Sequence, residues 1–301
     1  MEIRPNPLQQ GDVVRIVSPA SRPEERWVDR CTNILERWGL TVELGRHVFS
    51  QHGFLAGTDE ERAADFNDAV RSPTVRAIIA SRGGKGSYRL VDLIEWTALR
   101  RDPKFVVGFS DVTALHFAIW NHCQIVSLHG GLFGGAAYDV GEGTQASLRS
   151  ALLNERPEPL VARVDEPTSV LTSDGVAQGR LLGGNLSIVG TSAGWLLPDL
   201  KGSILLIEAI DMGPGLIDRT LQMLRRGGHL EGIAGVAIGQ FEQVNFKPPL
   251  SAIDLLREHL GRLNVPIVGG LPIGHGHDPS TVPLGRVVRL DADRQCLSFE
   301  T

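Results

Sequence analysis

The stretch KFVVGFSDVTALHFAIWN, residues 104–121, holds in order a predicted strand, a sharp turn and a predicted helix. Residues 104–108 form a run typical of a buried strand, and residues 112–121 are predicted to be helical. The same order recurs before it, with strand-like segments at 12–18, 41–44 and 75–80 and helical segments at 24–38, 58–70 and 88–99. This alternation predicts a parallel sheet covered by helices.

The pattern changes near residue 150. The segment NERPEPLVARVDEP, residues 154–167, is rich in proline and charge, which is typical of a linker. Beyond it, short strands, glycine-rich turns and fewer helices indicate a second, smaller α+β domain. We therefore expect an α/β protein with an N-terminal domain over residues 1–153, a linker over 154–168 and a C-terminal domain over 169–301.

The composition argues against several classes of protein. A net charge of −5 disfavours a nucleic-acid partner, because neutralising phosphates requires a basic surface. Three cysteines cannot form a disulfide scaffold, and an odd number is usual in a reducing compartment. Neither a signal peptide nor an apolar run near the ~20 residues of a membrane span is visible. We expect a cytoplasmic protein with no membrane partner.

The turn after residues 104–108 is the first candidate site. In Gly108-Phe109-Ser110-Asp111, a serine follows a buried strand and a helix starts at once. This is the pattern of a nucleophile elbow, in which the helix N-terminus offers backbone N–H groups to an oxyanion. The second glycine of the usual elbow motif is missing. The alternative is that Ser110 or Asp111 simply caps the helix.

A second glycine-rich turn, SRGGKGS at residues 81–87, also joins a predicted strand to a predicted helix. Glycines allow the backbone to approach a ligand closely, so Gly83 and Gly84 are candidates for an oxyanion or carboxylate cradle. The turn matches neither the phosphate-loop nor the dinucleotide-binding pattern. The alternative is an ordinary tight turn.

Two further candidates lie beyond the linker. Glu208 ends the strongly apolar strand 204–207, where a carboxylate is costly unless it is paired, so it is a natural partner for a histidine. His275 and His277 lie in a glycine-rich loop with Asp278, which suggests either a catalytic base or part of a metal site. The alternatives are a strand leaving the core and solvated loop histidines. Ser110, Glu208 and His275 all follow strand ends, where open α/β sheets bind ligands.

Several motifs, in this order along the chain, resemble the LD-carboxypeptidase family of serine peptidases. They are SPA (18–20), FLAGTDEER (54–62), SRGGKG (81–86), GFSDVT (108–113), HG (129–130), GRLLGGNL (179–186), IE (207–208), IDR (217–219), PIGH (272–275) and TVPLG (281–285). This family includes muramoyltetrapeptide carboxypeptidases and microcin C7 self-immunity peptidases. The resemblance spans nearly the whole chain.

The resemblance implies roles for individual residues. Ser110 becomes the nucleophile, Glu208 the acid and His275, rather than His277, the base. The backbone N–H groups of Asp111 and of the turn formed by Arg82, Gly83 and Gly84 become the oxyanion donors. It also implies an N-terminal domain like class I glutamine amidotransferases, a swivelling C-terminal domain, a cytoplasmic homodimer, and no metal or cofactor.

The implied reaction is release of terminal D-Ala from murein tetrapeptide in peptidoglycan recycling. Its substrate is a small peptide with a free C-terminal carboxylate, which Arg82 or a helix N-terminus could bind. Many members have an aromatic-Arg pair where this chain has Gly215-Leu216, which leaves substrate choice open. The alternatives are a microcin-immunity-type peptidase acting on aminoacyl-nucleotide amides, with Trp195 available to stack on adenine, and a non-catalytic ligand-binding protein.

Overall fold

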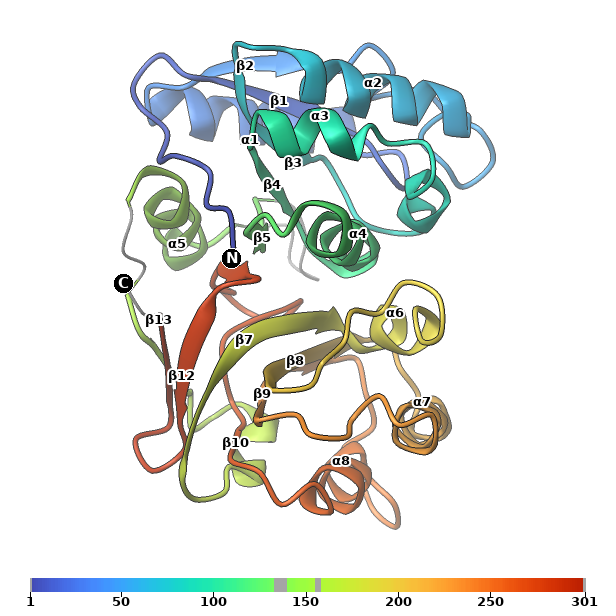
Figure 1. Cartoon of the computed structure of the whole chain (residues 1–301), viewed down its shortest axis with the longest axis vertical. Coiled ribbons are helices and arrows are strands. Elements are labelled where there is room, and N and C mark those ends of the chain that lie inside the picture. Colours follow the sequence, from blue (N-terminus) through green and yellow to red (C-terminus); the bar gives the residue numbers. More distant parts are fainter. Residues whose placement is uncertain (1, 133–139, 155–157, 300–301) are drawn as a thin grey trace. The chain divides into compact units, whose positions relative to one another are not determined.

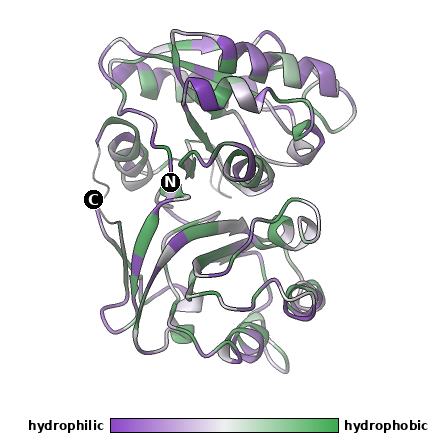
Figure 2. Ribbon diagram, viewed as in Figure 1, coloured by the Kyte–Doolittle hydropathy of each residue, from purple (hydrophilic) through white to green (hydrophobic). Residues whose placement is uncertain are grey.

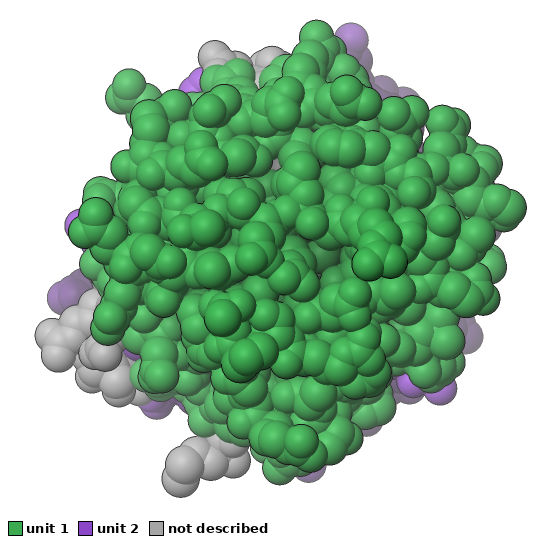
Figure 3. All heavy atoms as spheres, turned by 90° about the horizontal axis from the view of Figure 1, so that it is seen from above, with its two compact units in different colours: residues 1–155, 281–283 green, residues 156–280, 284–301 purple. Residues whose placement is uncertain are grey.

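The computed structural model describes residues 2–132, 140–154 and 158–299. The chain divides into two compact units. The first comprises residues 1–155 and 281–283, and the second comprises residues 156–280 and 284–301. Figure 3 colours the two units separately.

The first unit is built on a six-stranded sheet with the strand order β11-β5-β4-β3-β1-β2. Figure 1 labels β1 to β5 of this sheet. Its strands are β1 (Val13–Val17), β2 (Thr41–Leu44), β3 (Val75–Ala80), β4 (Phe105–Gly108), β5 (Ser127–His129) and β11 (Val282–Leu284). Its α-helices, within the described residues, are α1 (Glu25–Arg37), α2 (Asp59–Arg71), α3 (Trp96–Arg101), α4 (Thr113–Cys123) and α5 (Glu142–Leu153). β2, β1, β3, β4 and β5 pair in parallel. The predicted parallel sheet is confirmed.

Apolar strand residues form the core of the first unit. Ile16, Ile79 and Val107 are fully buried. Strands that are covered on both faces have continuous apolar sequences. In Figure 2, β4 has mostly hydrophobic colours, whereas α2 is largely hydrophilic. α2 begins with a capping box, in which Thr58 and Glu61 each accept the other's backbone N–H.

The helix expected over residues 88–99 is wrong in its extent. The structure has a short 3-10 helix at Ser87–Leu90, and α3 begins only at Trp96. Asn67 on α2 accounts for the break, because its amide donates to the Leu93 carbonyl at 2.8 Å and accepts the Glu95 N–H at 2.9 Å. These bonds hold the chain in a non-helical turn.

The second unit is built on a seven-stranded mixed sheet with the order β10-β9-β8-β7-β12-β13-β6. Its strands are β6 (Leu160–Val161), β7 (Val176–Asn185), β8 (Ser203–Ile210), β9 (Gly235–Glu242), β10 (Ile267–Val268), β12 (Val287–Asp291) and β13 (Cys296–Phe299). Its α-helices, among described residues, are α6 (Leu186–Thr191), α7 (Pro214–Arg226) and α8 (Ala252–Gly261). The first four strands of this order pair in parallel and the rest antiparallel.

The second unit includes part of the segment expected to be a linker, because β6 pairs with β13. β8 is buried along nearly its whole length, which places its end in an apolar setting. In the described part of the chain, no helix has the length and apolarity needed to cross a bilayer.

Candidate active site

Ser110 occupies a sharp turn between β4 and α4. β4 ends at Gly108, a 3-10 helix spans Ser110–Val112, and α4 follows. Ser110 has a φ of +60°, in the left-handed region that non-glycine residues rarely adopt. No side chain caps the backbone where this helical segment starts, so the alternative that Ser110 or Asp111 is an N-cap is wrong. The strained turn is typical of a residue held for function.

The backbone of the glycine-rich turn lies directly against Ser110. A Cβ added to Gly83 would lie 2.9 Å from the Ser110 Cβ and 3.2 Å from its Oγ, so a side chain there would crowd the serine. Gly84 has a φ of +100°, and a Cβ there would collide with the Ser21 hydroxyl. Ser21 holds the turn, since its N–H donates to the Gly83 carbonyl and its Oγ accepts the Lys85 N–H, both at 3.2 Å.

Asp111 ties the two turns together. Its Oδ2 accepts the Ser87 N–H at 2.7 Å, and the Ser87 hydroxyl donates to the Asp111 carbonyl at 2.5 Å. Burial raises the pKa of the Asp111 carboxyl, and the hydrogen bonds from Ser87 oppose that rise. The side chain of Asp111 is therefore engaged in holding the turns, which leaves its backbone as the part available for an oxyanion role.

Arg82 lines a surface pocket of about 600 Å³ within the first unit. Its guanidinium donates to the Arg22 carbonyl at 3.1 Å. Ser21, Arg22 and Phe54 line the same pocket, and Phe54 is 59% exposed. An arginine guanidinium is suited to binding a peptide carboxylate, and the exposed Phe54 ring gives the same pocket an apolar surface.

Glu208 and His275 form a buried pair in the second unit. Glu208 is near the end of β8, and its Oε2 accepts a hydrogen bond from His275 Nδ1 at 2.6 Å. Glu208 is 0% exposed and His275 is 8% exposed. Because a carboxylate only accepts, His275 carries its proton on Nδ1, and Nε2 holds the lone pair of the ring. Gly274, with a φ of +127°, allows the approach, since a Cβ there would lie 2.9 Å from Glu208 Oε2.

Gln240 holds the loop that carries His275, and sequence reasoning missed it. It is fully buried at the end of β9; its Oε1 accepts the Gly276 N–H at 3.0 Å. Its Nε2 donates to Glu166 Oε1 at 2.7 Å and to the His277 carbonyl at 3.1 Å. An amide inside the otherwise apolar run GVAIGQF was the available signal.

His277 differs from its neighbour in its surroundings. It is exposed to solvent, and its carbonyl accepts from Arg163 at 2.7 Å. Within the described residues no group of three His, Cys, Asp or Glu side chains is placed to hold a metal ion. The metal alternative for His275, His277 and Asp278 therefore has no geometric support here.

The predicted site residues fall in both units. The structure brings Ser110, Asp111, Gly83 and Gly84 together in the first unit, with Arg82 on the same turn. It joins Glu208 to His275 in the second unit.

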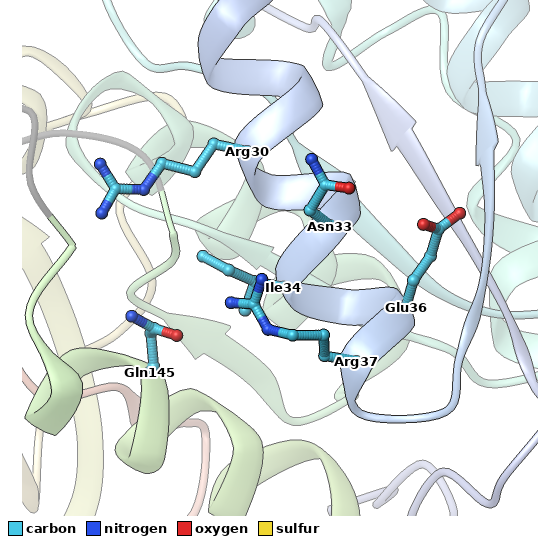
Figure 4. Close-up of a pocket in the computed structure, with 6 residues that line it drawn as sticks. All are labelled: Arg30, Asn33, Ile34, Glu36, Arg37 and Gln145. Carbon is cyan, nitrogen blue, oxygen red and sulfur yellow. The ribbon is translucent and has the colours of Figure 1, made fainter.

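A second pocket, of about 720 Å³, lies between α1 and α5 of the first unit (Figure 4). Its lining residues are Arg30, Asn33, Ile34, Glu36, Arg37 and Gln145. None of these six residues was predicted from the sequence to belong to a functional site.

Comparisons with known proteins match both the N-terminal and the C-terminal part of the chain to the same family. Residues 14–130 match the family model for the LD-carboxypeptidase N-terminal domain, and residues 178–290 match that for the C-terminal domain. A probable murein peptide carboxypeptidase of Bacillus subtilis is 34% identical over 291 residues, covering 95% of this chain and 90% of that protein. The microcin C7 self-immunity protein MccF of Escherichia coli is 24% identical, covering 97% and 94%. The solved muramoyltetrapeptide carboxypeptidase from Oxalobacter formigenes has a TM-score of 0.83 and 27% identity, covering 95% and 97%.

Proposed function

Because the chain belongs to the LD-carboxypeptidase family of serine peptidases, we propose that it releases the terminal D-Ala from murein tetrapeptide in peptidoglycan recycling. One observation carries the mechanism: Ser110 stands at a strained strand-to-helix turn with the glycine backbone of Gly83 against it. The buried bond between Glu208 and His275 supports the same mechanism. The proposal requires Ser110 and His275 to meet during the reaction.

The chemistry is acyl transfer. Ser110 Oγ attacks the scissile carbonyl carbon while His275 Nε2 takes the hydroxyl proton. Glu208 fixes the tautomer of His275 and stabilises the imidazolium. The same proton then passes to the leaving amine of D-Ala as the C–N bond breaks. Water, activated by His275, hydrolyses the acyl-enzyme and regenerates Ser110.

Backbone N–H groups would stabilise the tetrahedral oxyanion. The candidates are those of Asp111 and of the turn formed by Arg82, Gly83 and Gly84. Losing one such donor costs on the order of 10²–10³ in rate. The close approach of Gly83 to Ser110 supports this role.

The substrate is a small peptide with a free C-terminal carboxylate. We assign Arg82 to that carboxylate, since its guanidinium lines a pocket next to the turn that approaches Ser110. We further propose a cytoplasmic homodimer that needs neither metal nor cofactor and binds no nucleic acid.

Ser110→Ala tests the proposal. The parent protein should release D-Ala from murein tetrapeptide, and the variant should lose that activity while keeping its folded structure. Glu208→Gln should lose most of the activity, because an amide no longer enforces the His275 tautomer. Unchanged release by Ser110→Ala would refute the serine mechanism, and a fluorophosphonate that labels Ser110 would exclude a non-catalytic protein.

An exposed aromatic ring favours the second candidate, a peptidase of the microcin-immunity type. Trp195 is 57% exposed, and its Nε1 donates to the Thr191 carbonyl at 2.8 Å. An exposed indole face can stack on a nucleobase. Incubation with murein tetrapeptide and with an aminoacyl-nucleotide amide in parallel separates the two: we expect faster release of D-Ala, and the reverse preference would favour the second candidate.

A further inference from the structure

Two buried histidines lie beside the Ser110 turn and have no part in the proposed chemistry. His116, on α4, is 2% exposed, and His129, at the end of β5, is 0% exposed. Their ring centroids are 6.1 Å apart. His129 also packs edge-on against Phe109, the residue before Ser110, with ring centroids 6.3 Å apart.

His116 is bonded to the residue at which the turn begins. Its Nε2 lies 2.8 Å from the Gly108 carbonyl oxygen. A carbonyl only accepts, so His116 carries its proton on Nε2. Its Nδ1 has no hydrogen-bond partner among the residues that the structure describes. Leaving this buried nitrogen unpaired costs less free energy when it carries a lone pair than when it carries an N–H. Burial, and then the neighbouring His129, lower the pKa of His116 to about 3 and keep this ring neutral.

The Gly108 carbonyl therefore receives two donors from separate elements. One is His116 on α4, and the other is the Gly130 N–H after β5, at 3.1 Å. Together they fix the peptide plane between Gly108 and Phe109. The His116 bond also closes a loop from the end of β4, through the turn, to the second turn of α4. Ser110 lies inside that loop.

A left-handed serine persists only where its surroundings over-determine the backbone. We propose that His116 is a positioning residue for Ser110, which holds the turn in its strained conformation through the Gly108 carbonyl. The proposal rests on the proposed function of Ser110 as nucleophile. His116 touches neither substrate nor reacting atoms, so its loss acts on the geometry of the serine rather than on proton transfer.

Three substitutions separate positioning from simple packing. His116→Gln retains a donor at the distance of Nε2, His116→Asn has a donor that is too short to reach, and His116→Phe fills the space without a donor. We expect the Phe and Asn variants to lower kcat and the rate of fluorophosphonate labelling by about 10- to 100-fold, with KM within about twofold. His116→Gln should restore most of both rates.

His259→Phe is the matched control. His259 is a buried histidine of the second unit, 3% exposed, that bonds Asp218 at 2.8 Å, and its replacement should leave the labelling rate of Ser110 unchanged. If His116→Phe does not fold, the comparison of Gln with Asn decides. Equal labelling rates for these two, in folded protein, would overturn the proposal. Ser110→Ala, assayed beside them, shows separately whether Ser110 is the nucleophile at all.

Discussion

Replacing His116 by Gln should reduce the loss of unfolding free energy that occurs when the pH is lowered. The folded pKa of His116 is lowered to about 3 from the ordinary value of 6.5, chiefly by burial. As the pH falls below 6.5, His116 binds a proton in the unfolded chain but stays unprotonated in the folded protein. The contribution of His116 to stability is therefore fully present above pH 6.5 and is lost as the pH falls toward 3.

The difference between the folded and unfolded pKa values of His116 sets the size of this loss of stability. With unfolded and folded values of 6.5 and about 3, the linkage integral from pH 7 to pH 5 is RT ln[(1 + 10^1.5)/(1 + 10^−0.5)], which is about 2 kcal/mol. The parent should lose this much unfolding free energy through His116 alone, and His116→Gln should not.

Urea unfolding at pH 7 and pH 5 measures the difference. The parent and His116→Gln are compared at both pH values, with His52→Gln as the control, because His52 is exposed to solvent. We expect the parent and the control to lose about 2 kcal/mol more than His116→Gln. An equal loss in all three proteins would show that the folded protein binds a proton at His116 as readily as the unfolded chain does, which would refute the reasoning.

Three further predictions concern the second unit. Gly274→Ala should lower kcat by about 10²-fold, because the new Cβ would lie 2.9 Å from Glu208 Oε2; steady-state release of D-Ala at the parent rate would contradict this. Gln240→Ala should cost about 1–3 kcal/mol of unfolding free energy, since the Gly276 N–H loses its acceptor; an unchanged urea midpoint would count against it. Ellman's reagent should modify one thiol of the native protein, Cys296, since the other two cysteines are buried; fast labelling that survives Cys296→Ser would show otherwise.

The sequence predicted best those strands of the sheet that are buried on both faces. The runs at 75–80 and 104–108 read as strands because both faces of a covered sheet select apolar residues, and both are strands in the structure. Ser110 could be placed at a strand-to-helix junction for the same reason. Its positive φ could not be predicted, since it depends on neighbours that come from other parts of the chain.

The remaining features depend on contacts between distant segments. The helix expected at 88–99 is interrupted because Asn67, on another helix, bonds the backbone there. Gln240 braces the His275 loop from a separate strand, and His116 lies in the middle of an apolar helical run. A local pattern records the polarity of such residues but not their partners. Tertiary structure supplies those partners.

The strand β11 has a consequence for synthesis of the protein. Residues 281–283 belong to the first unit, whose other residues end at 155, and β11 is the edge strand beside β5. Because β11 ends at Leu284, the ribosome must add a further 129 residues (284 − 155) before that sheet can be completed, which takes roughly 6–26 s at ordinary elongation rates. During this interval β5 is an open edge, and unpaired edges template aggregation. A fragment ending at residue 155 would keep that edge permanently, so we expect it to be less soluble than the whole chain.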